Sequence, residues 1–474
     1  MTTAASPSVS PSAHPAPVAP SVHPAPVDAG LLGPLLDRLI RRHAVPGAQL
    51  AVTHRGVTSV VTAGEELFGG GQPVTPESRF PLGSLTKPFT ATLLMTLVDE
   101  GEIEPDEPLG EQFPELAPVV GAFGSLLTLR HLLSHTGGLP GSHPAARPPA
   151  DRARYVRDAC AQGPLSPPGT AFSYSNIGPV AAGLVAELVL GMDWEEAVDS
   201  VLCRPLGLRP VFVTAPGAAA HHVSGHAAAP RLGTARPVAQ LLPPVEAPSG
   251  GLALSAPDLL RFGTLFADAP VRPLAPLLPA PRITEGMRRV QPHTDAFGLA
   301  DAWGLGPAHY LAAGGGTWVG HDGTGDGTSC HLRIEPREGT GVALTTNAGT
   351  GLALWDDLVA ELGEAGFDVA SHPFTRLRGE VPEAPDEVLE RCLGTYRNGA
   401  TEYRLVRDSE GVRLDQGGRP FARLAVRADL TFSVIELTTE RTCYVGRFVE
   451  SAGTGRIDRL QISGRLAVRS GRAA

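Results

Sequence analysis

A serine three residues ahead of a lysine is the strongest chemical signal in this chain of 474 residues. Of the 39 basic residues only Lys87 is a lysine, and a lysine, unlike an arginine, can lose its proton inside a protein. Because Ser84 and Lys87 are one helical turn apart, a neutral Lys87 amine can take the proton of the Ser84 hydroxyl and make it a nucleophile. The spacing therefore predicts a serine acyl-transfer enzyme in which burial or nearby cations lower the pKa of Lys87.

Two more short motifs carry groups that acyl transfer uses. Tyr174 can relay a proton to a leaving group, and the amide of Asn176 can hold a substrate carbonyl, although an asparagine at this place can also simply cap the next helix. His321 lies in a glycine-rich stretch, residues 320–327, where either a ligand approaches the backbone closely or the histidine is a bystander in a turn. The stretch lacks the Lys-Ser/Thr ending of a phosphate-binding loop.

In combination, these motifs resemble those of the penicillin-recognising serine hydrolases, which include class C β-lactamases, D-Ala-D-Ala peptidases, D-aminopeptidases and related esterases. The family's S-x-x-K, Y-x-N and H-x-G patterns match residues 84–87, 174–176 and 321–323, and the resemblance extends over roughly residues 30–365. It implies an α/β (α+β) fold, with an antiparallel sheet flanked by helices and a helical subdomain. His321 replaces a lysine of the family, so the charge facing a substrate carboxylate would depend on pH, and β-lactam hydrolysis is not expected.

The resemblance also implies roles for single residues. The backbone N–H groups of Ser84 and Thr324 would hold the oxyanion. Neither a cofactor nor a metal is implied. Four further residues are expected to contact substrate: Glu246, Gly250, Asp322 and Gly323. Five histidines that could be mistaken for metal ligands are interpreted as structural: His131, His135, His221, His222 and His226.

Within the family, the chain looks most like the penicillin-binding-protein-type thioesterases, cytoplasmic enzymes with an added C-terminal barrel that release and cyclise nonribosomal peptides. The likeness lies in total length, in the preference for arginine over lysine, in Glu246 four residues before Gly250, and in the Leu-Gly-Thr-Tyr start of a lipocalin-like domain at residue 393. It implies a peptidyl thioester substrate, on the carrier protein of a nonribosomal peptide synthetase or diffusible, with a D-residue at its acyl end. Ser84 would take this peptide as an acyl-enzyme, which closes head to tail as a macrolactam. A barrel arginine would bind the substrate carboxyl group, with three candidates: Arg456, Arg459 and Arg465.

Three other functions stay open from the sequence. Two use the same acyl-enzyme: a D-stereospecific peptidase or esterase that hydrolyses it, and a transacylase that passes the acyl group to an external amine. The third is a non-catalytic ligand sensor on the same fold, which the presence of Ser84, Lys87 and Tyr174 disfavours.

The elements that must position these residues follow from apolar spacing. Residues 84–100 have helical spacing that stops at Gly101, and residues 48–54 and 57–63 alternate as in a hairpin. Further helices are predicted over 31–43, 179–190 and 257–266, and strands over 403–407, 412–415, 422–426, 432–437, 443–449 and 457–462. The predicted division is a disordered Pro/Ala-rich leader (1–28), a β-lactamase-like catalytic domain (29–370), a linker (371–386) and an antiparallel lipocalin-like β-barrel (387–474).

Composition excludes several classes of protein. The formal net charge of −10 argues against a nucleic-acid binder, which would present a basic face. No apolar run is long enough to span a membrane, and the first residues lack the basic start and apolar core of a secretory signal. The five cysteines are scattered and show no metal-binding spacing. A cytoplasmic protein with reduced thiols and no membrane partner is therefore expected.

Overall fold

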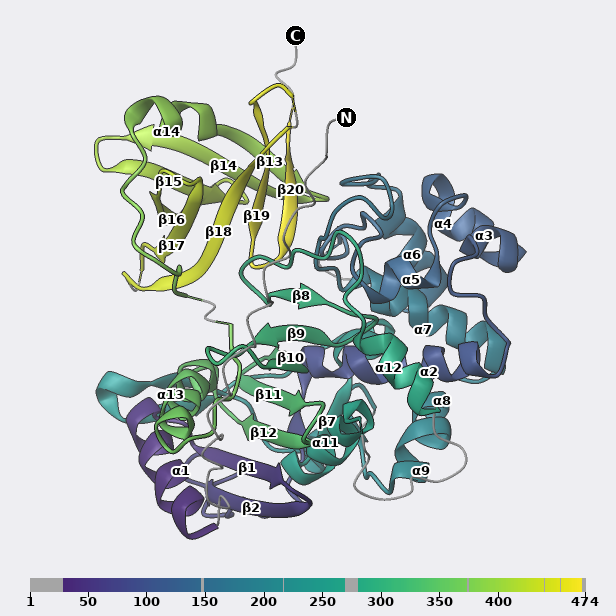
Figure 1. Cartoon of the computed structure of the whole chain (residues 1–474), viewed down its shortest axis with the longest axis vertical. Helices are drawn as coiled ribbons and strands as arrows, with labels where there is room; N and C mark the ends of the chain where they lie inside the picture. The colour runs from purple at the N-terminus through teal and green to yellow at the C-terminus, as the bar shows by residue number, and fades with distance from the viewer. Residues whose placement is uncertain are drawn as a thin grey trace, which may run out of the picture.

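The protein combines a seven-stranded sheet, a group of helices and a closed β-barrel (Figure 1). The predicted leader, residues 1–28, lies outside the described residues. This computed structural model describes residues 29–145, 149–215, 217–268, 280–372, 375–438, 440–451 and 453–470.

The large sheet is antiparallel, with strand order β2-β1-β12-β11-β10-β9-β8. The predicted hairpin is confirmed as β1 and β2, and every residue of β1 is buried because helices cover both faces of the sheet. Helices α1 and α13 pack together on one face, while α11 covers the other (Figure 1). The bounds are β1 Gly47–His54, β2 Val57–Gly64, β8 Ala302–Trp303, β9 Ala308–Leu311, β10 Thr317–Gly325, β11 Thr328–Glu335, β12 Thr340–Thr346, α1 Ala29–His43, α11 Ala256–Gly263 and α13 Gly351–Glu364.

Helix α2, Thr86–Asp99, is the central helix of the catalytic part. Twelve of its fourteen residues are buried, so it belongs to the core rather than to an amphipathic surface layer. It packs against α7 and α10. The surrounding elements are α3 Leu109–Gln112, α4 Ala117–Val120, α5 Leu129–Leu133, α6 Arg152–Cys160, α7 Ile177–Leu190, α8 Trp194–Val198, α9 Arg204–Leu206, α10 Ala247–Gly250, α12 Pro281–Arg288, β3 Phe80–Pro81, β4 Val211–Phe212, β5 His226–Ala229, β6 Thr234–Pro237 and β7 Leu252–Leu254.

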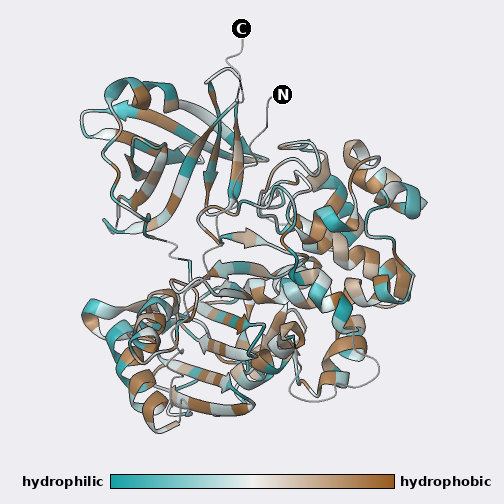
Figure 2. Ribbon diagram, in the orientation of Figure 1, coloured by the Kyte–Doolittle hydropathy of each residue, from teal (hydrophilic) through white to brown (hydrophobic). Residues whose placement is uncertain are grey.

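The C-terminal part is a closed antiparallel barrel of eight strands preceded by α14, Asp386–Cys392. All six strands predicted there are present, and the barrel closes through β13 and β20, which were not predicted. Apolar side chains of alternate residues form its interior, and Figure 2 shows hydrophobic and hydrophilic residues alternating along its strands. The strands are β13 Gly394–Asn398, β14 Thr401–Asp408, β15 Gly411–Gln416, β16 Arg419–Val426, β17 Thr431–Glu436, β18 Thr442–Glu450, β19 Ile457–Ile462 and β20 Arg465–Arg469.

One end of the barrel is hydrogen-bonded to the catalytic part. In the turn between β19 and β20, Gly464 accepts from Tyr174 N at 2.9 Å and donates to Phe297 O at 2.8 Å. Nearby, Gly141 N donates to the Asn398 side chain at 2.7 Å. The barrel residue that follows Gly464 is therefore held beside a tyrosine of the predicted active site.

Among the described residues, no single helix is both long and apolar enough to cross a membrane. The bent pair of α7 with residues 194–206 reaches the required length and composition, but residues 177–186 of α7 are buried inside the protein.

Candidate active site

Ser84 lies in a turn of 3₁₀ helix, Gly83–Leu85, directly before α2 rather than inside it. Two glycines let this turn touch β10. A Cβ on Gly83, whose φ is +53°, would lie 2.3 Å from Thr324 O, and a Cβ on Gly323 would lie 2.0 Å from a carbonyl oxygen just before the turn. The absence of both side chains therefore brings the nucleophile against the strand that carries the H-x-G motif.

Lys87 is in place to act as the base. Its Nζ lies 2.9 Å from Ser84 Oγ and 2.9 Å from Ser249 O, and the residue is only 4% exposed. Burial lowers the pKa of Lys87 to about 7, helped by the positive charge of Arg465 and opposed by the negative charge of Glu246. An appreciable fraction of this lysine is therefore neutral at neutral pH.

Tyr174 lies beside the nucleophile as a neutral phenol. Burial raises the pKa of Tyr174 to about 12, although its hydrogen bond with Ser84 and the charge of Arg465 act in the opposite direction. Lys87 Nζ lies 5.2 Å and the Arg465 guanidinium carbon 5.1 Å from the centroid of the Tyr174 ring. Because this phenol keeps its proton at neutral pH, Tyr174 is suited to relay protons and Lys87 to act as the base.

Two aromatic side chains that the sequence did not assign to the site hold Tyr174 in place. The ring centroids of His135 and Trp303 lie 4.5 Å and 5.7 Å from that of Tyr174. His135 also accepts a hydrogen bond from Ser175 N at 3.3 Å. His135 was expected to be structural, and its contacts are of that kind, but they are made with Tyr174, the predicted proton relay, and with the neighbouring Ser175.

Asn176 does not cap α7 with its side chain. The hydroxyl of Ser175 accepts from Ile177 N at 3.1 Å and from Gly178 N at 3.4 Å, so that serine does the capping. Asn176 lines a cleft together with Ser84. Its predicted contact with a substrate carbonyl is thus compatible with the geometry.

The charge of His321 was expected to depend on pH, but the structure makes this side chain neutral near neutral pH. Burial, together with the charge of Lys87, lowers the pKa of His321 to about 3, so the ring is neutral. Its Nδ1 lies 2.6 Å from Asp322 O, and since a carbonyl only accepts, Nδ1 carries the proton. Nε2 is then a buried acceptor, and within the described part of the chain it has no partner.

Asp322, predicted to contact substrate, lines the cleft at Ser84, and that contact stays a prediction. Its carboxylate accepts from Arg333 at 2.8 Å, His331 at 2.6 Å and Tyr310 at 3.0 Å. Burial alone would raise the pKa of Asp322, but the charges of Arg333 and His331 outweigh it and hold the pKa far below its usual range. These bonds tie β10 to its neighbours β9 and β11. Gly323 allows β10 to pack against the turn that carries Ser84.

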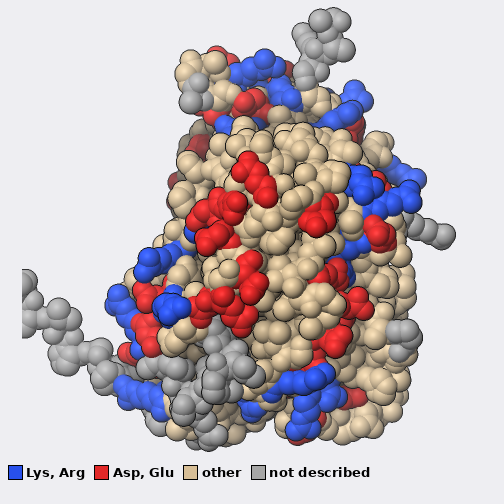
Figure 3. Space-filling model, turned by 90° about the vertical axis from the view of Figure 1, so that its right-hand side faces the viewer, with Lys and Arg blue, Asp and Glu red and all other residues tan. Residues whose placement is uncertain are grey.

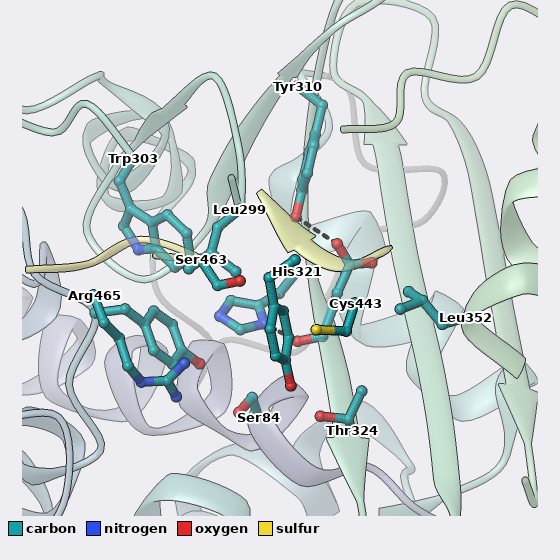
Figure 4. Close-up of a pocket in the computed structure, with 13 residues that line it drawn as sticks. Ser84, Leu299, Trp303, Tyr310, His321, Thr324, Leu352, Cys443, Ser463 and Arg465 are labelled. Carbon is teal, nitrogen blue, oxygen red and sulfur yellow. Dashed lines mark hydrogen bonds between the residues drawn. The ribbon is translucent and has the colours of Figure 1, made fainter. Parts of the chain in front are cut away.

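Two clefts meet at Ser84. The first lies toward the barrel and is lined by His321, Thr324 and Arg465, which Figure 4 shows around Ser84. Of the three candidate arginines, Arg465 is therefore the one placed at the site. Arg459 pairs with Asp458 instead, and the exposed Arg456 lies in the turn between β18 and β19, at the other end of the barrel.

The second cleft lies on the other side of Ser84 and contains Glu246. Its carboxylate accepts a hydrogen bond from the Tyr155 hydroxyl at 2.9 Å, so it is fixed rather than solvated at random. Gly250 and Thr324 line the same cleft. Their contacts with substrate, and the oxyanion role of the Ser84 and Thr324 N–H groups, stay predictions.

Two of the histidines interpreted as structural make hydrogen bonds with different parts of the fold. His131 caps α5 through Thr128, and His226 bonds Asn347 O and Phe68 N. In the part of the chain that the structure describes, no three His, Cys, Asp or Glu side chains gather as a metal site.

The sequence is similar to a family of known proteins and to several of its members. Residues 33–364 match the family model described as Beta-lactamase. Penicillin-binding protein 4 of Amycolatopsis lactamdurans is 34% identical over 334 residues, which cover 69% of this chain and 87% of that protein. Esterase EstB of Burkholderia gladioli is 30% identical over 60% of this chain and 79% of its own length.

A solved structure similar to the whole molecule is the crystal structure of SurE. It is 36% identical, with a TM-score of 0.80, and the match covers 93% of this chain and 99% of SurE. A further structure of SurE, with D-Leu, has a TM-score of 0.76. The similarity therefore extends over the barrel as well as the sheet.

Proposed function

Because this chain belongs to the Beta-lactamase family of serine hydrolases and acyltransferases, we propose that it is a peptidyl transferase that closes peptides into macrolactams. The observation that carries the acyl-transfer chemistry is the 2.9 Å contact between Ser84 and a lysine whose pKa is about 7. An ordinary lysine, with a pKa of roughly 10.4, would be neutral in only about one molecule in a few thousand at pH 7.

The first half of the reaction makes the acyl-enzyme. Ser84 Oγ attacks the carbonyl carbon of a peptidyl thioester while Lys87 takes the hydroxyl proton. The carbon–sulfur bond breaks, and the thiol leaves with a proton returned through Lys87 and Tyr174. The backbone N–H groups of Ser84 and Thr324 are the proposed oxyanion donors.

The second half uses the peptide's own amine in place of water. The N-terminal nitrogen attacks the ester carbon and Lys87 accepts its proton. The carbon–oxygen bond to Ser84 then breaks to release the lactam, and Lys87 returns the proton to Ser84 Oγ. Glu246 supports an amine nucleophile because its carboxylate, in the cleft opposite Arg465, can attract an ammonium group. Arg465 can hold a carbonyl or carboxylate of the peptide on the barrel side.

Two features of the substrate remain part of the proposal. The donor is a peptidyl thioester, delivered by a carrier protein of a nonribosomal peptide synthetase or diffusible. The acyl end is a D-residue, which the structural similarity to SurE, solved with D-Leu, supports.

A peptide thioester with a small thiol as leaving group tests the proposal. Peptides ending in a D- or an L-residue are incubated with the enzyme, and the products are separated by mass. We expect a cyclic product, lighter by one water than the linear acid, from the D-peptide only. Ser84→Ala and Lys87→Arg should reduce it by at least 10²–10³-fold, since arginine cannot give up its proton. Linear acid as the sole product would exclude cyclisation.

Hydrolysis is the second candidate because Esterase EstB matches at 30% identity. It predicts linear acid from every active substrate and no effect of Glu246→Gln on the product ratio. An amide-forming transacylase would instead give a mixed amide when an external amine is added. A non-catalytic sensor would fail to react with a serine-directed phosphonate at Ser84.

A further inference from the structure

The barrel end that faces the catalytic part contains a pocket of its own. Its volume of about 420 Å³ lies in the range of small-ligand pockets, roughly 300–1,000 Å³. The floor consists of side chains from the barrel interior, and the rim carries the uncharged polar groups Asn398, Thr401 and Gln416. The floor residues are Leu414, Phe421, Val434 and Ile462. We call this space the barrel-mouth pocket.

The barrel-mouth pocket adjoins the cleft at Ser84. Three residues line both spaces: Tyr444, Ser463 and Arg465. Two of them flank Gly464, whose hydrogen bonds fix the turn to Tyr174 and Phe297. A substrate that reaches Arg465 from the nucleophile therefore arrives at the edge of the barrel interior.

The Ser463 hydroxyl independently suggests that the pocket receives a polar ligand group. Ser463 is 6% exposed, and its Oγ has no hydrogen-bond partner among the described residues. Buried hydroxyls in folded proteins are almost always bonded. A backbone group of a bound peptide can supply the missing bond at this position, where the two spaces meet.

The lining determines what chemistry fits. Arg465 is the one charged side chain among the described residues that line the barrel-mouth pocket, and none of them is acidic. A cationic group would meet Arg465 without a counter-charge, whereas an apolar side chain would bury itself on the aliphatic and aromatic floor. A carbonyl next to that side chain could accept from Arg465 and from Ser463.

We propose that the barrel mouth is a specificity subsite that binds a large apolar side chain of the peptide, on a residue adjoining the one that reacts at Ser84. The inference rests on the proposed peptide substrate. The barrel would then select among peptide sequences, in addition to supplying Arg465.

The test uses a series of peptide thioesters that differ only at the residues adjoining the reacting one, with Gly, Ala, Leu or Phe. Release of the small thiol is measured, so cyclisation and hydrolysis count equally. We expect kcat/KM for Leu or Phe at one of these positions to exceed that for Gly by about tenfold, as is typical of a hydrophobic pocket. Gln416→Trp, which places an indole at the mouth, should bring this ratio close to one. Ser409→Trp, at an exposed turn on the opposite end of the barrel, should keep the wild-type ratio.

A second variant covers the case in which Gln416→Trp does not fold. Phe421→Ala deepens the floor and should shift the preferred side chain from Leu toward Phe. An unchanged ratio in whichever of the two variants folds, or a wild-type enzyme indifferent to the series, would overturn the subsite. Failure of a serine-directed phosphonate to label Ser84 would instead overturn the proposed function, so the two failures are distinguishable.

Discussion

At the scale of single residues, the site depends on how two opposite charges act on one amine. Arg465 lowers and Glu246 raises the pKa of Lys87, while burial sets its general level near 7. The arginine comes from the barrel and the glutamate from the 3₁₀ turn Pro244–Glu246. The protonation of the base is therefore tuned by residues that also line the two substrate clefts.

Removing the charge of Arg465 and removing that of Glu246 should move the acidic limb of the pH–rate profile in opposite directions. Lys87 is inactive when protonated, so activity toward a small aryl ester should rise through about pH 7. Arg465→Gln removes a cation that disfavours the ammonium form, and the limb should move to higher pH. Glu246→Gln should move it to lower pH, in each case by roughly half to one unit. A shift of both variants in the same direction would contradict the assignment.

The lowered pKa of Lys87 also predicts a stability penalty. Between about pH 7 and the ordinary lysine value of 10.5, the unfolded chain binds a proton that the folded one does not, so stability rises with pH across that window and is lowest below it. Lys87→Met should therefore be inactive but more stable at pH 6 by about 1–3 kcal/mol. Chemical denaturation at pH 6 and pH 9 measures the difference, which should shrink at the higher pH.

The sequence predicted the residues that are close along the chain and missed those that meet only through the fold. Ser84 and Lys87 lie three positions apart, so local geometry sufficed. Arg465 could not be chosen from three arginines because only the docking of the barrel brings it to Tyr174. Trp303 gave no signal at all, since its role is a contact with that same tyrosine ring.

At the scale of elements, apolar spacing predicted the β1–β2 hairpin, four helices and six barrel strands, whereas the rest of the large sheet was implied only by the family resemblance. The two barrel strands that were not predicted, β13 and β20, are five residues each and share only two register pairs, Tyr396 with Arg469 and Arg397 with Val468. Their closure joins the first and last strands of the barrel, a pairing that local apolar spacing does not reveal. Ser84 was predicted to open an α-helix but lies in a 3₁₀ turn, because the turn packs closely against β10, a contact that local spacing does not indicate.

The turn between β19 and β20 is the element on which the barrel's contribution depends. Gly464 has φ +69°, and a Cβ there would lie 2.4 Å from Leu299 Cδ1. Gly464→Ala should displace Arg465 and lower kcat/KM for a peptide thioester by about tenfold. The matched control is Gly455→Ala, with φ +61° and no atom within 4 Å of the added Cβ, which carries the backbone penalty alone, roughly 1–2 kcal/mol. Equal activity of the two variants would show that the turn does not position the arginine.

At the scale of the whole molecule, charge is divided unevenly. Residues 387–474 hold 15 arginines and 11 acidic residues, a formal +4, which leaves −14 on the rest of the chain. In Figure 3, which shows the helical side of the catalytic part, acidic side chains spread over the middle of the surface, and basic side chains lie at the barrel end and around the edges. The ion pair of Arg447 with Asp295 is partly exposed, so the buried hydrogen bonds around Gly464 and Asn398 should matter more for docking.

The nucleophile, base and tyrosine all precede the barrel in the chain, so loosening the barrel should separate two activities. Asn398→Ala leaves the buried Gly141 N–H without its 2.7 Å bond, which weakens docking by about 1–3 kcal/mol. At pH 9, where Lys87 is neutral with or without the charge of Arg465, turnover of a peptide thioester, which needs Arg465, should fall by about tenfold. Hydrolysis of a small aryl ester at the same pH should change less than about twofold, since Ser84 and Lys87 stay in contact. Thr431→Ala removes a hydroxyl that bonds Asp429 at the opposite end of the barrel and should affect neither activity. If Asn398→Ala lowered both activities equally, the barrel would be supporting the catalytic part as a whole rather than completing the substrate site.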